Sequence, residues 1–327
     1  MKKSLLTAAF ATLAGFANAQ VLTVYTYDSF VPEWGPGPQI EAAFEAECAC
    51  DLQFVAAGDG AALLSRLKLE GARTEADIVL GLDTSLLASA KESGLFAPHS
   101  GIPDTLTLPI TWTDDTFLPF DWGYFAFVYD NTKIETPPAS FAELLQSQYS
   151  LIIEDPRSST PGLGLLYWVK LLYGDEAPSV WSRLAPRIVT VTKGWSEAYG
   201  LFLEGEADFV LSYTTSPLYH ILAEEDGTKS AAIFTEGHYL QIEVAAKLAT
   251  TDQPELADQF LAFMTTAAFQ SVIPETNWMY PAAANGVDVN PAFNDGLDAI
   301  KPLLFSPEDS EAIRTEALDE WRSALSQ

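Results

Sequence analysis

The sequence is poor in the side chains that most often bind metals or act as nucleophiles. It has three histidines, His99, His220 and His238, and two cysteines, Cys48 and Cys50. The histidines are scattered, and only His220 stands where it could line a pocket. No histidine or third cysteine lies near the cysteine pair to complete a zinc site. Because serine-hydrolase, zinc-protease, Walker and dinucleotide-binding patterns are also missing, we expect neither a metal site nor an enzyme.

Basic residues are scarce as well. The chain has 17 lysines and arginines against 45 aspartates and glutamates, which gives a formal charge of −28. This acidity argues against nucleic acid and anionic membranes as partners, and it is compatible with a cationic ligand. After residue 19 no stretch approaches the roughly 18–20 consecutive apolar residues of a membrane helix, so we expect no membrane insertion.

The N-terminus carries the one segment with the pattern of a secretory signal. Lys2 and Lys3 precede an apolar run over residues 5–16, and Ala17-Asn18-Ala19 has the small-residue pattern of a cleavage site. No cysteine that could carry a lipid follows it. We expect cleavage after Ala19 and export to a periplasm, which leaves 308 of the 327 residues, a size typical of two lobes.

The two cysteines are separated by a single residue. An oxidising compartment permits a disulfide between Cys48 and Cys50, but such a bridge closes a very small ring. The sequence leaves open whether they are bonded.

The N-terminal part of the chain alternates between strand and helix patterns. Strands are predicted over 21–25, 51–56 and 77–80, and helices over 39–47, 61–70 and 86–93. Asp59 stands at the expected N-cap of the second helix. This order is typical of a mostly parallel sheet with helices on its faces. The aromatic, strand-like run 117–130 then breaks the alternation, as expected of a segment that crosses between lobes.

The rest of the chain returns to the same alternation. Helices are predicted over 141–148, 162–173, 254–264 and 307–325, and strands over 151–154, 189–192, 209–213 and 239–246. Before the helix that begins near Pro161, Ser159 or Thr160 is the expected hydroxyl cap. Small hydroxyls and glycines at a helix N-terminus can form an anion site, but without other support an ordinary capped helix is the preferred interpretation. Residues 277–281 are predicted to form an exposed aromatic loop.

Residues 189–220 form the most informative unit. The pattern predicts a strand, a turn, a helix capped by Ser196, a buried strand and the first turn of another helix. Trp195 and Tyr213 therefore follow the carboxyl ends of strands, where open α/β sheets bind small ligands. Tyr219 lies one turn into the next helix. These aromatic side chains indicate a ligand site, unless they only cover the end of the sheet.

Eight segments carry the most specific patterns: TVYTYDSF (23–30), WGPGP (34–38), ADIVLGLD (76–83), DPRSSTPGLGLL (155–166), VTVTKGWSEAYGLFL (189–203), LSYTTSPLYHIL (211–222), EGHYLQIEVAA (236–246) and NWMYP (277–281). Together they resemble the family of periplasmic thiamine-binding proteins, the substrate-binding components of thiamine ABC importers. The resemblance covers essentially the whole mature chain. It implies the α/β fold of a type 2 periplasmic binding protein, with two α/β lobes, a hinge and a ligand cleft between the lobes.

The resemblance also implies boundaries and a binding site. Residues 1–19 are the expected signal peptide, 20–122 with 241–283 the first lobe, and 123–240 with 284–327 the second. The ligand-binding residues carried over by position are Tyr27, Trp34, Asp59, Ser159, Trp195, Tyr213, Tyr219 and Trp278. Thr160, Gly162 and Lys193 are additional candidates.

The implied ligands are thiamine and its mono- and diphosphate, with no cofactor and no metal. Thiamine has a permanent cationic thiazolium ring and a flat aminopyrimidine, and both suit aromatic faces. Asp59 is expected either to offset the thiazolium charge or to accept from the amino group, and the helix N-terminus at Ser159 suits the hydroxyethyl end or its phosphate. The expected monomer closes on its ligand by hinge motion and delivers it to a permease driven by a partner ATPase.

Two other function classes share this fold. Thiamine-degrading enzymes attack with a cysteine, but Cys48 and Cys50 follow the first predicted helix and not a proposed ligand loop. Ferric-ion binders use adjacent tyrosines, and the sequence contains no Tyr-Tyr pair. Both alternatives are therefore less favoured than a thiamine carrier.

Overall fold

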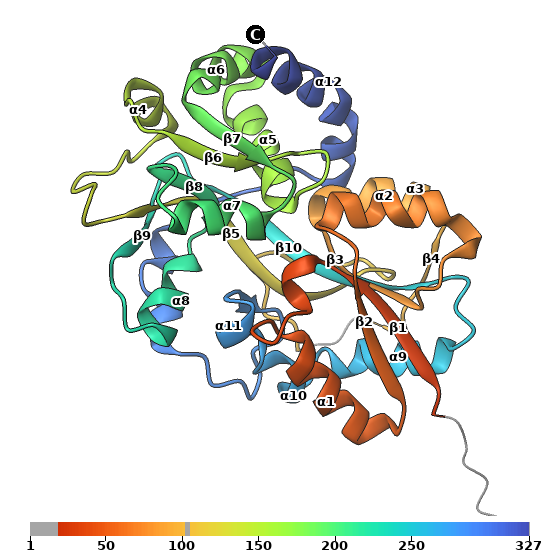
Figure 1. Ribbon diagram of the computed structural model, residues 1–327. Coiled ribbons are helices and arrows are strands. Elements are labelled where there is room, and N and C mark those ends of the chain that lie inside the picture. The colour runs from red at the N-terminus through yellow and green to blue at the C-terminus, as the bar shows by residue number, and fades with distance from the viewer. Residues whose placement is uncertain (1–18, 102–104, 327) are drawn as a thin grey trace, which may run out of the picture.

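The computed structural model describes residues 19–101 and 105–326 (Figure 1). All of the predicted signal peptide except Ala19 lies outside the described residues. Within the described ranges, no helix combines the length and the apolar character needed to cross a membrane.

The first lobe is built on three parallel strands. β1 (Val21–Thr26) lies between β2 (Asp51–Ala56) and β3 (Ile78–Asp83). α1 (Gly37–Cys48) connects β1 to β2, and α2 (Gly60–Glu70) connects β2 to β3. All six residues of β3 are buried, as expected for a strand covered on both faces. The predicted alternation is confirmed here, and the element ends differ from the predicted ones by at most three residues.

The second lobe repeats this arrangement with a different set of elements. β6 (Leu151–Glu154) pairs in parallel with β7 (Ile188–Thr192) and with β8 (Phe209–Tyr213). α5 (Thr160–Tyr173) follows β6, and α7 (Trp195–Leu203) connects β7 to β8. The carboxyl ends of these strands face the first lobe (Figure 1).

Two long antiparallel strands join the lobes through the middle of the sheet. β5 (Leu118–Asp130) pairs with β10 (His238–Leu248) over residues 118–124, and with β8 over residues 125–129. The strand order is β2-β1-β3-β10-β5-β8-β6-β7. The aromatic run that breaks the predicted alternation is therefore a crossing strand, as expected.

The remaining helices pack around the lobes, and the remaining short strands pair with β5 or β10. They are α3 (Leu87–Glu92), β4 (Phe96–Ala97), α4 (Phe141–Gln146), α6 (Ala177–Leu184), α8 (Ser216–Ala223), β9 (Lys229–Ala232), α9 (Pro254–Phe263), α10 (Ala267–Gln270), α11 (Ile273–Thr276), β11 (Tyr280–Pro281), β12 (Pro302–Leu303) and α12 (Pro307–Leu325). α12 packs on α5 and α6 and also contacts α3, so the C-terminal helix touches both lobes.

The prediction of an exposed aromatic loop over 277–281 is wrong for most of that segment. Met279 and Tyr280 are only 3% and 7% exposed. β11 pairs with β5, and this pairing stacks Tyr280 on Trp122 with ring centroids 4.3 Å apart. Only residues up to Trp278 remain partly accessible, because β11 adds to the edge of a strand that is distant in sequence.

The structure answers the question that the sequence leaves open about the cysteines. Cys48, the last residue of α1, is bonded to Cys50, and their Cα atoms are 5.2 Å apart. Ala49 between them has a φ of +53° and ends the helix in the left-handed region. The bridge therefore fixes the turn between α1 and β2.

We predict a small stability loss when this bridge is removed. Because the closed loop is so short, replacing both cysteines with serine is expected to lower the free energy of unfolding by about 1–2 kcal/mol. Urea unfolding of the wild type and of the Cys48→Ser/Cys50→Ser variant measures the difference. A loss above about 4 kcal/mol would show that the bridge does more than constrain the unfolded chain.

Candidate ligand-binding site

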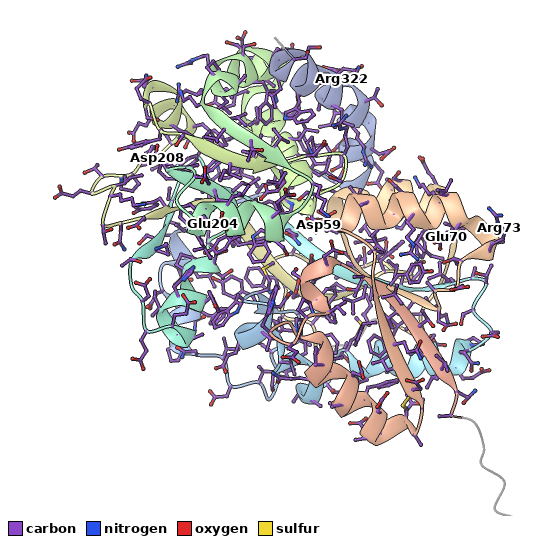
Figure 2. The ribbon with its side chains drawn as sticks, in the orientation of Figure 1. Asp59, Glu70, Arg73, Glu204, Asp208 and Arg322 are labelled. Carbon is purple, nitrogen blue, oxygen red and sulfur yellow. A yellow bond between two sulfur atoms is a disulfide. The ribbon has the colours of Figure 1, made fainter. Side chains whose placement is uncertain are left out.

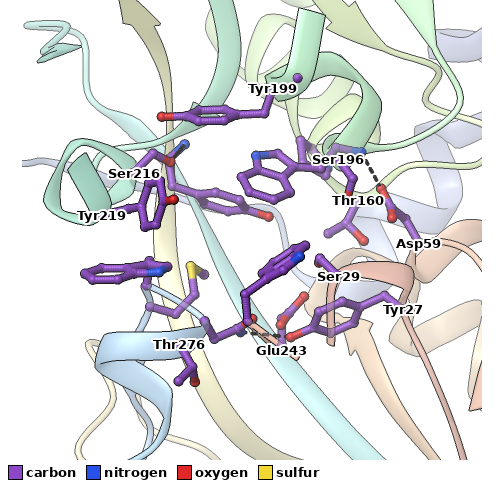
Figure 3. Close-up of a pocket in the computed structure, with 18 of the residues that line it drawn as sticks. Tyr27, Ser29, Asp59, Thr160, Ser196, Tyr199, Ser216, Tyr219, Glu243 and Thr276 are labelled. Carbon is purple, nitrogen blue, oxygen red and sulfur yellow. Dashed lines mark hydrogen bonds between the residues drawn. The ribbon is translucent and has the colours of Figure 1, made fainter. Parts of the chain in front are cut away.

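A cavity of about 560 Å³ lies between the two lobes (Figure 3). This volume is within the range of roughly 300–1,000 Å³ that is usual for small-molecule sites. Eight of the predicted site residues line it: Tyr27, Trp34, Asp59, Thr160, Trp195, Tyr213, Tyr219 and Trp278. The structure thus brings together side chains from both lobes at the carboxyl ends of strands, as the sequence analysis predicts.

The other three predicted residues do not line the cavity. Ser159 is fully buried at the N-cap position of α5, where its hydroxyl makes no capping hydrogen bond. Gly162 allows α5 to begin against β6, since a Cβ atom there would lie 2.5 Å from the carbonyl oxygen of Glu154. Lys193 is exposed in the turn before α7. Their positions place them behind or beside the cavity wall.

Aromatic rings form much of the cavity wall. The Trp195 ring stacks on Tyr199 with centroids 5.1 Å apart, and its Nε1 donates to Ser212 Oγ at 2.8 Å. Elsewhere in the wall, Trp278 meets Tyr219 edge to face, with ring centroids 5.5 Å apart. Such faces suit a flat or cationic ligand, because the ring quadrupole attracts positive charge.

A buried histidine holds two of these rings in place. His220 Nε2 is 2.9 Å from the Tyr199 hydroxyl, and His220 Nδ1 is 2.7 Å from Glu224 Oε2. The Tyr219 hydroxyl donates to the other oxygen of Glu224 at 2.9 Å. His220 itself is 1% exposed, and it positions the rings without lining the cavity.

Hydrogen bonds join the two lobes beside the cavity. Asp59 Oδ2 accepts from the backbone N–H of Trp195 at 3.0 Å, the bond that Figure 3 draws, and Figure 2 places Asp59 at the junction of the lobes. The Gly60 N–H donates to Thr160 Oγ1 at 3.1 Å, and the Ala62 N–H donates to the Ser158 carbonyl at 3.1 Å. The N-termini of α2, α5 and α7 therefore meet at one edge of the cleft.

These contacts correct two predicted helix caps. Asp59 occupies the N-cap position of α2, but its carboxylate makes no capping bond there. It accepts instead from the backbone N–H of Trp195, the first residue of α7. Ser196 does not cap α7, because the helix begins at Trp195 with Gly194 at the N-cap position. At the N-terminus of α7, the Asp59 carboxylate thus takes the place predicted for the Ser196 hydroxyl. The helix dipole favours negative charge at this position.

The environment of Asp59 shifts its titration. Burial raises the pKa of Asp59 from 3.8 to about 6, and the Trp195 N–H opposes this shift. The carboxylate is therefore ionised at neutral pH but close to its titration range. A cation in the cavity would favour the ionised form.

The backbone at Trp278 is held in an unfavourable conformation. Trp278 has a φ of +57°, and its N–H donates to the carbonyl of Ile273 at 3.1 Å, which places it just past the end of α11. Glycine is preferred at such positions, and a bulky residue there stores strain of about 1–3 kcal/mol. Strain of this kind is typical of functional sites, so Trp278 is a strong candidate for ligand contact.

We predict that the cost of the strained backbone at Trp278 can be measured separately from the loss of its indole ring. Trp278→Gly and Trp278→Ala both remove the indole, but only glycine adopts this φ without strain. The glycine variant is expected to be about 1 kcal/mol more stable to urea than the alanine variant. Equal stability of the two variants would show that the left-handed backbone costs nothing here.

The structure also reveals cavity residues that the sequence analysis missed. Tyr199 is one of them, and its position one helical turn after Trp195 on the same helix is a usable signal. Glu243 is another; a glutamate amid apolar residues in a buried strand is unusual unless it has a role. Further lining residues are Ser29, Ser196, Ser216, Thr276, Asn277 and Met279.

The described residues support neither of the two alternative functions, which are attack on thiamine by a cysteine and binding of a ferric ion. Cys48 and Cys50 are bonded to each other and do not line the cavity, so they present no nucleophile there. Across residues 19–101 and 105–326, no group of three or more His, Cys, Asp or Glu side chains is arranged to hold a metal ion.

Comparison with known proteins agrees with this architecture. Residues 74–310 match the family described as "Bacterial extracellular solute-binding protein". The chain is 53% identical to the thiamine-binding periplasmic protein of Escherichia coli K12, over 100% of this chain and 99% of that protein. It is 51% identical to the thiamine-binding periplasmic protein of Brucella suis, over 99% of this chain and 98% of that protein.

Solved structures lead to the same family. A periplasmic thiamin binding protein superposes with a TM-score of 0.90 at 53% identity, over 94% of this chain and 97% of that one. Iron-bound HitA of Pseudomonas aeruginosa superposes with a TM-score of 0.76 at 23% identity, over 93% of this chain and 99% of HitA, and shows the shared fold alone. These matches confirm the type 2 binding-protein fold and, since the relatives are binding proteins, the expectation of a non-enzyme. The chain belongs to the bacterial extracellular solute-binding proteins and, within them, to the family of thiamine-binding periplasmic proteins.

Proposed function

We propose that this protein captures thiamine, thiamine monophosphate and thiamine diphosphate in the periplasm and delivers them to an ABC importer. One observation carries the proposal: in a member of this family, the described residues that line the cavity between the lobes include many aromatic rings and several carboxylates but no basic side chain. The N-terminal signal peptide directs export and is cleaved after Ala19. The permease receives the ligand, and its ATPase subunit supplies the energy.

The proposed ligand contacts follow the chemistry of the wall. The thiazolium ring lies against the aromatic faces, where a cation gains about 0.5–2 kcal/mol per good contact. The aminopyrimidine stacks between rings such as Trp195 and Tyr219. Asp59 offsets the positive charge or accepts from the amino group. The full proposed set keeps the positions predicted from the sequence. Tyr27, Trp34, Asp59, Trp195, Tyr213, Tyr219 and Trp278, with Thr160 as an additional candidate, line the cavity and are the proposed direct contacts; Ser159, with Gly162 and Lys193 as additional candidates, lies behind or beside its wall.

The first turn of α5 is the proposed site for the hydroxyethyl end or its phosphates. Thr160 and Pro161 line the cavity at this helix N-terminus, where free N–H groups favour an anion. The Thr160 oxygen accepts from Gly60, so its hydroxyl hydrogen is left to donate to the ligand.

Lobe closure is the proposed conformational step. We assign residues 20–122 with 241–283 to the first lobe and 123–240 with 284–327 to the second. β5 exchanges β10 for β8 as its partner between Tyr124 and Phe125, next to the proposed boundary. Opening would break the hydrogen bonds of Asp59, Gly60 and Ala62 across the cleft, and a bound ligand would hold it closed.

Calorimetric titration of ligand-stripped, refolded protein tests this function. Refolding is needed because a tightly bound ligand that copurifies would mask the site. We expect submicromolar binding of thiamine, and titrations with the mono- and diphosphate then rank the three ligands. Light scattering on the same sample checks the proposed monomer. Absence of binding for all three ligands would refute the function.

A further inference from the structure

Three acidic side chains stand next to one another on adjacent strands beneath the cavity. Glu243 of β10 pairs across the sheet with Asp121 of β5 on one side and with Asp83 of β3 on the other. Directly opposed residues in antiparallel strands have Cβ atoms about 4.5–5.5 Å apart. Asp83 and Asp121 are fully buried, and Glu243 is 6% exposed. Of the three, only Glu243 lines the cavity, and Figure 3 shows it at the cavity floor near Tyr27.

The hydrogen bonds around Asp121 are incomplete. Asn277 Nδ2 donates to Asp121 Oδ2 at 2.6 Å and is 2.8 Å from the Tyr27 hydroxyl. The other oxygen, Asp121 Oδ1, is buried without a hydrogen-bond partner among the described residues. No lysine, arginine or histidine forms an ion pair with Asp121 or Glu243 in the part of the chain that the structure describes. Two adjacent buried carboxyl groups thus lack a compensating cation.

The surroundings of Glu243 and Asp121 oppose the simultaneous ionisation of both carboxyl groups. Burial raises the pKa of both carboxyl groups, and repulsion by Asp121 raises the pKa of Glu243 further. The other titratable groups that face Glu243 are Asp83, Tyr27 and Tyr213. Burial raises the pKa of both tyrosines, so they stay neutral and leave the charge of the pair uncompensated. Two close carboxylates of this kind hold one proton between them.

We propose that Glu243 is a further ligand-binding residue, which faces the amino or cationic group of the ligand from the cavity floor, and that a proton shared by Glu243 and Asp121 is released when the ligand binds. This inference rests on the proposed function. The step breaks one O–H bond, the proton passes to the buffer, and the positive ligand takes its place beside the carboxylate. Asp121 does not touch the ligand; it is a positioning residue that sets the charge of Glu243.

The test measures proton release directly. Thiamine is titrated calorimetrically into the wild type at pH 7.5 in buffers of different ionisation enthalpy, which yields both the Kd and the number of protons released. Asp59, whose pKa is about 6, is already ionised at this pH and contributes little. We expect a clear fraction of a proton, up to about one, to leave per thiamine bound.

Matched variants assign the proton to the pair. Glu243→Gln keeps the shape of the side chain and is expected to raise the Kd at least tenfold and to abolish the release. Asp121→Asn removes the repulsion that adds to burial in raising the pKa of Glu243, so it is expected to reduce the release with a much smaller change in Kd. Asp83→Asn and Glu255→Gln, the latter on the exposed first turn of α9, serve as controls that retain the release.

The outcomes separate the two proposals. Failure of the wild type to bind thiamine would refute the proposed function. Binding without proton release, or an unchanged Kd in Glu243→Gln, would overturn this inference and leave the function intact. Loss of proton release in Asp83→Asn would assign the proton to a pair that includes Asp83, and this result would also overturn the inference. Thermal unfolding of each variant checks the fold, and the wild-type measurement decides the proton release even if a variant does not fold.

Discussion

Replacing Asp59 with asparagine is expected to weaken thiamine binding by about 30- to 150-fold. The substitution keeps the size of the side chain but removes its negative charge from a cavity that receives a cation. It also weakens the bond to the Trp195 N–H that joins the lobes at 3.0 Å. Hydrogen bonds to charged groups contribute about 1.5–3 kcal/mol, and a loss of 2–3 kcal/mol corresponds to this range of affinity.

Calorimetry on the Asp59→Asn variant, with Asp252→Asn as an exposed control, measures this effect. A second signature is the dependence on pH. Because the ionised form binds the cation, wild-type affinity is expected to fall as the pH drops through about 6, the pKa of Asp59, and this fall is expected to be smaller in Asp59→Asn. Equal affinity of the two proteins at neutral pH would remove Asp59 from the site.

The same raised pKa has the opposite effect on the stability of the unliganded protein. The folded chain holds the Asp59 proton more tightly than the unfolded chain does, so it binds more protons between about pH 4 and pH 6. The contribution of Asp59 to stability therefore decreases as the pH rises through this window. Affinity and stability thus respond to the same titration with opposite signs.

Replacing Trp195 with alanine is expected to weaken thiamine binding by a comparable factor, about 30-fold or more. The indole provides an aromatic face, stacks on Tyr199 and donates to Ser212. Removing a central aromatic residue from a binding site typically costs about 2 kcal/mol or more. Trp195→Phe keeps a ring but loses the bond to Ser212, and it is expected to retain most of the affinity. Equal losses in both variants would assign the effect to Ser212 and not to the aromatic face.

Much of the fold follows from local patterns in the sequence. β8 and α12 begin and end at the predicted residues, because each is bounded by strong local signals: an apolar run for the strand, and Ser306 with Pro307 for the helix. The crossing strand β5 is also predicted, since a long aromatic run without an intervening helix fits few other roles. The short elements α6 and β9 have no predicted counterpart.

The errors occur where distant segments meet. Ser196 satisfies every local rule for an N-cap, yet Asp59 occupies that helix terminus from a position 136 residues away in the chain. Asn277 joins Tyr27 to Asp121 across even larger separations, and Glu243 becomes a cavity residue only through the pairing of β10 with β5. Such neighbours are fixed by topology, which a single sequence does not specify.

The most direct test of the account is a crystal structure of the protein with thiamine bound. We expect the vitamin inside the cavity between the lobes, with its rings against Trp195 and Trp278 and with the carboxyl groups of Asp59 and Glu243 within hydrogen-bond or ion-pair distance of its amino group or thiazolium ring. Thiamine bound elsewhere on the surface, or bound in the cavity without contact to either carboxyl group, would contradict the account.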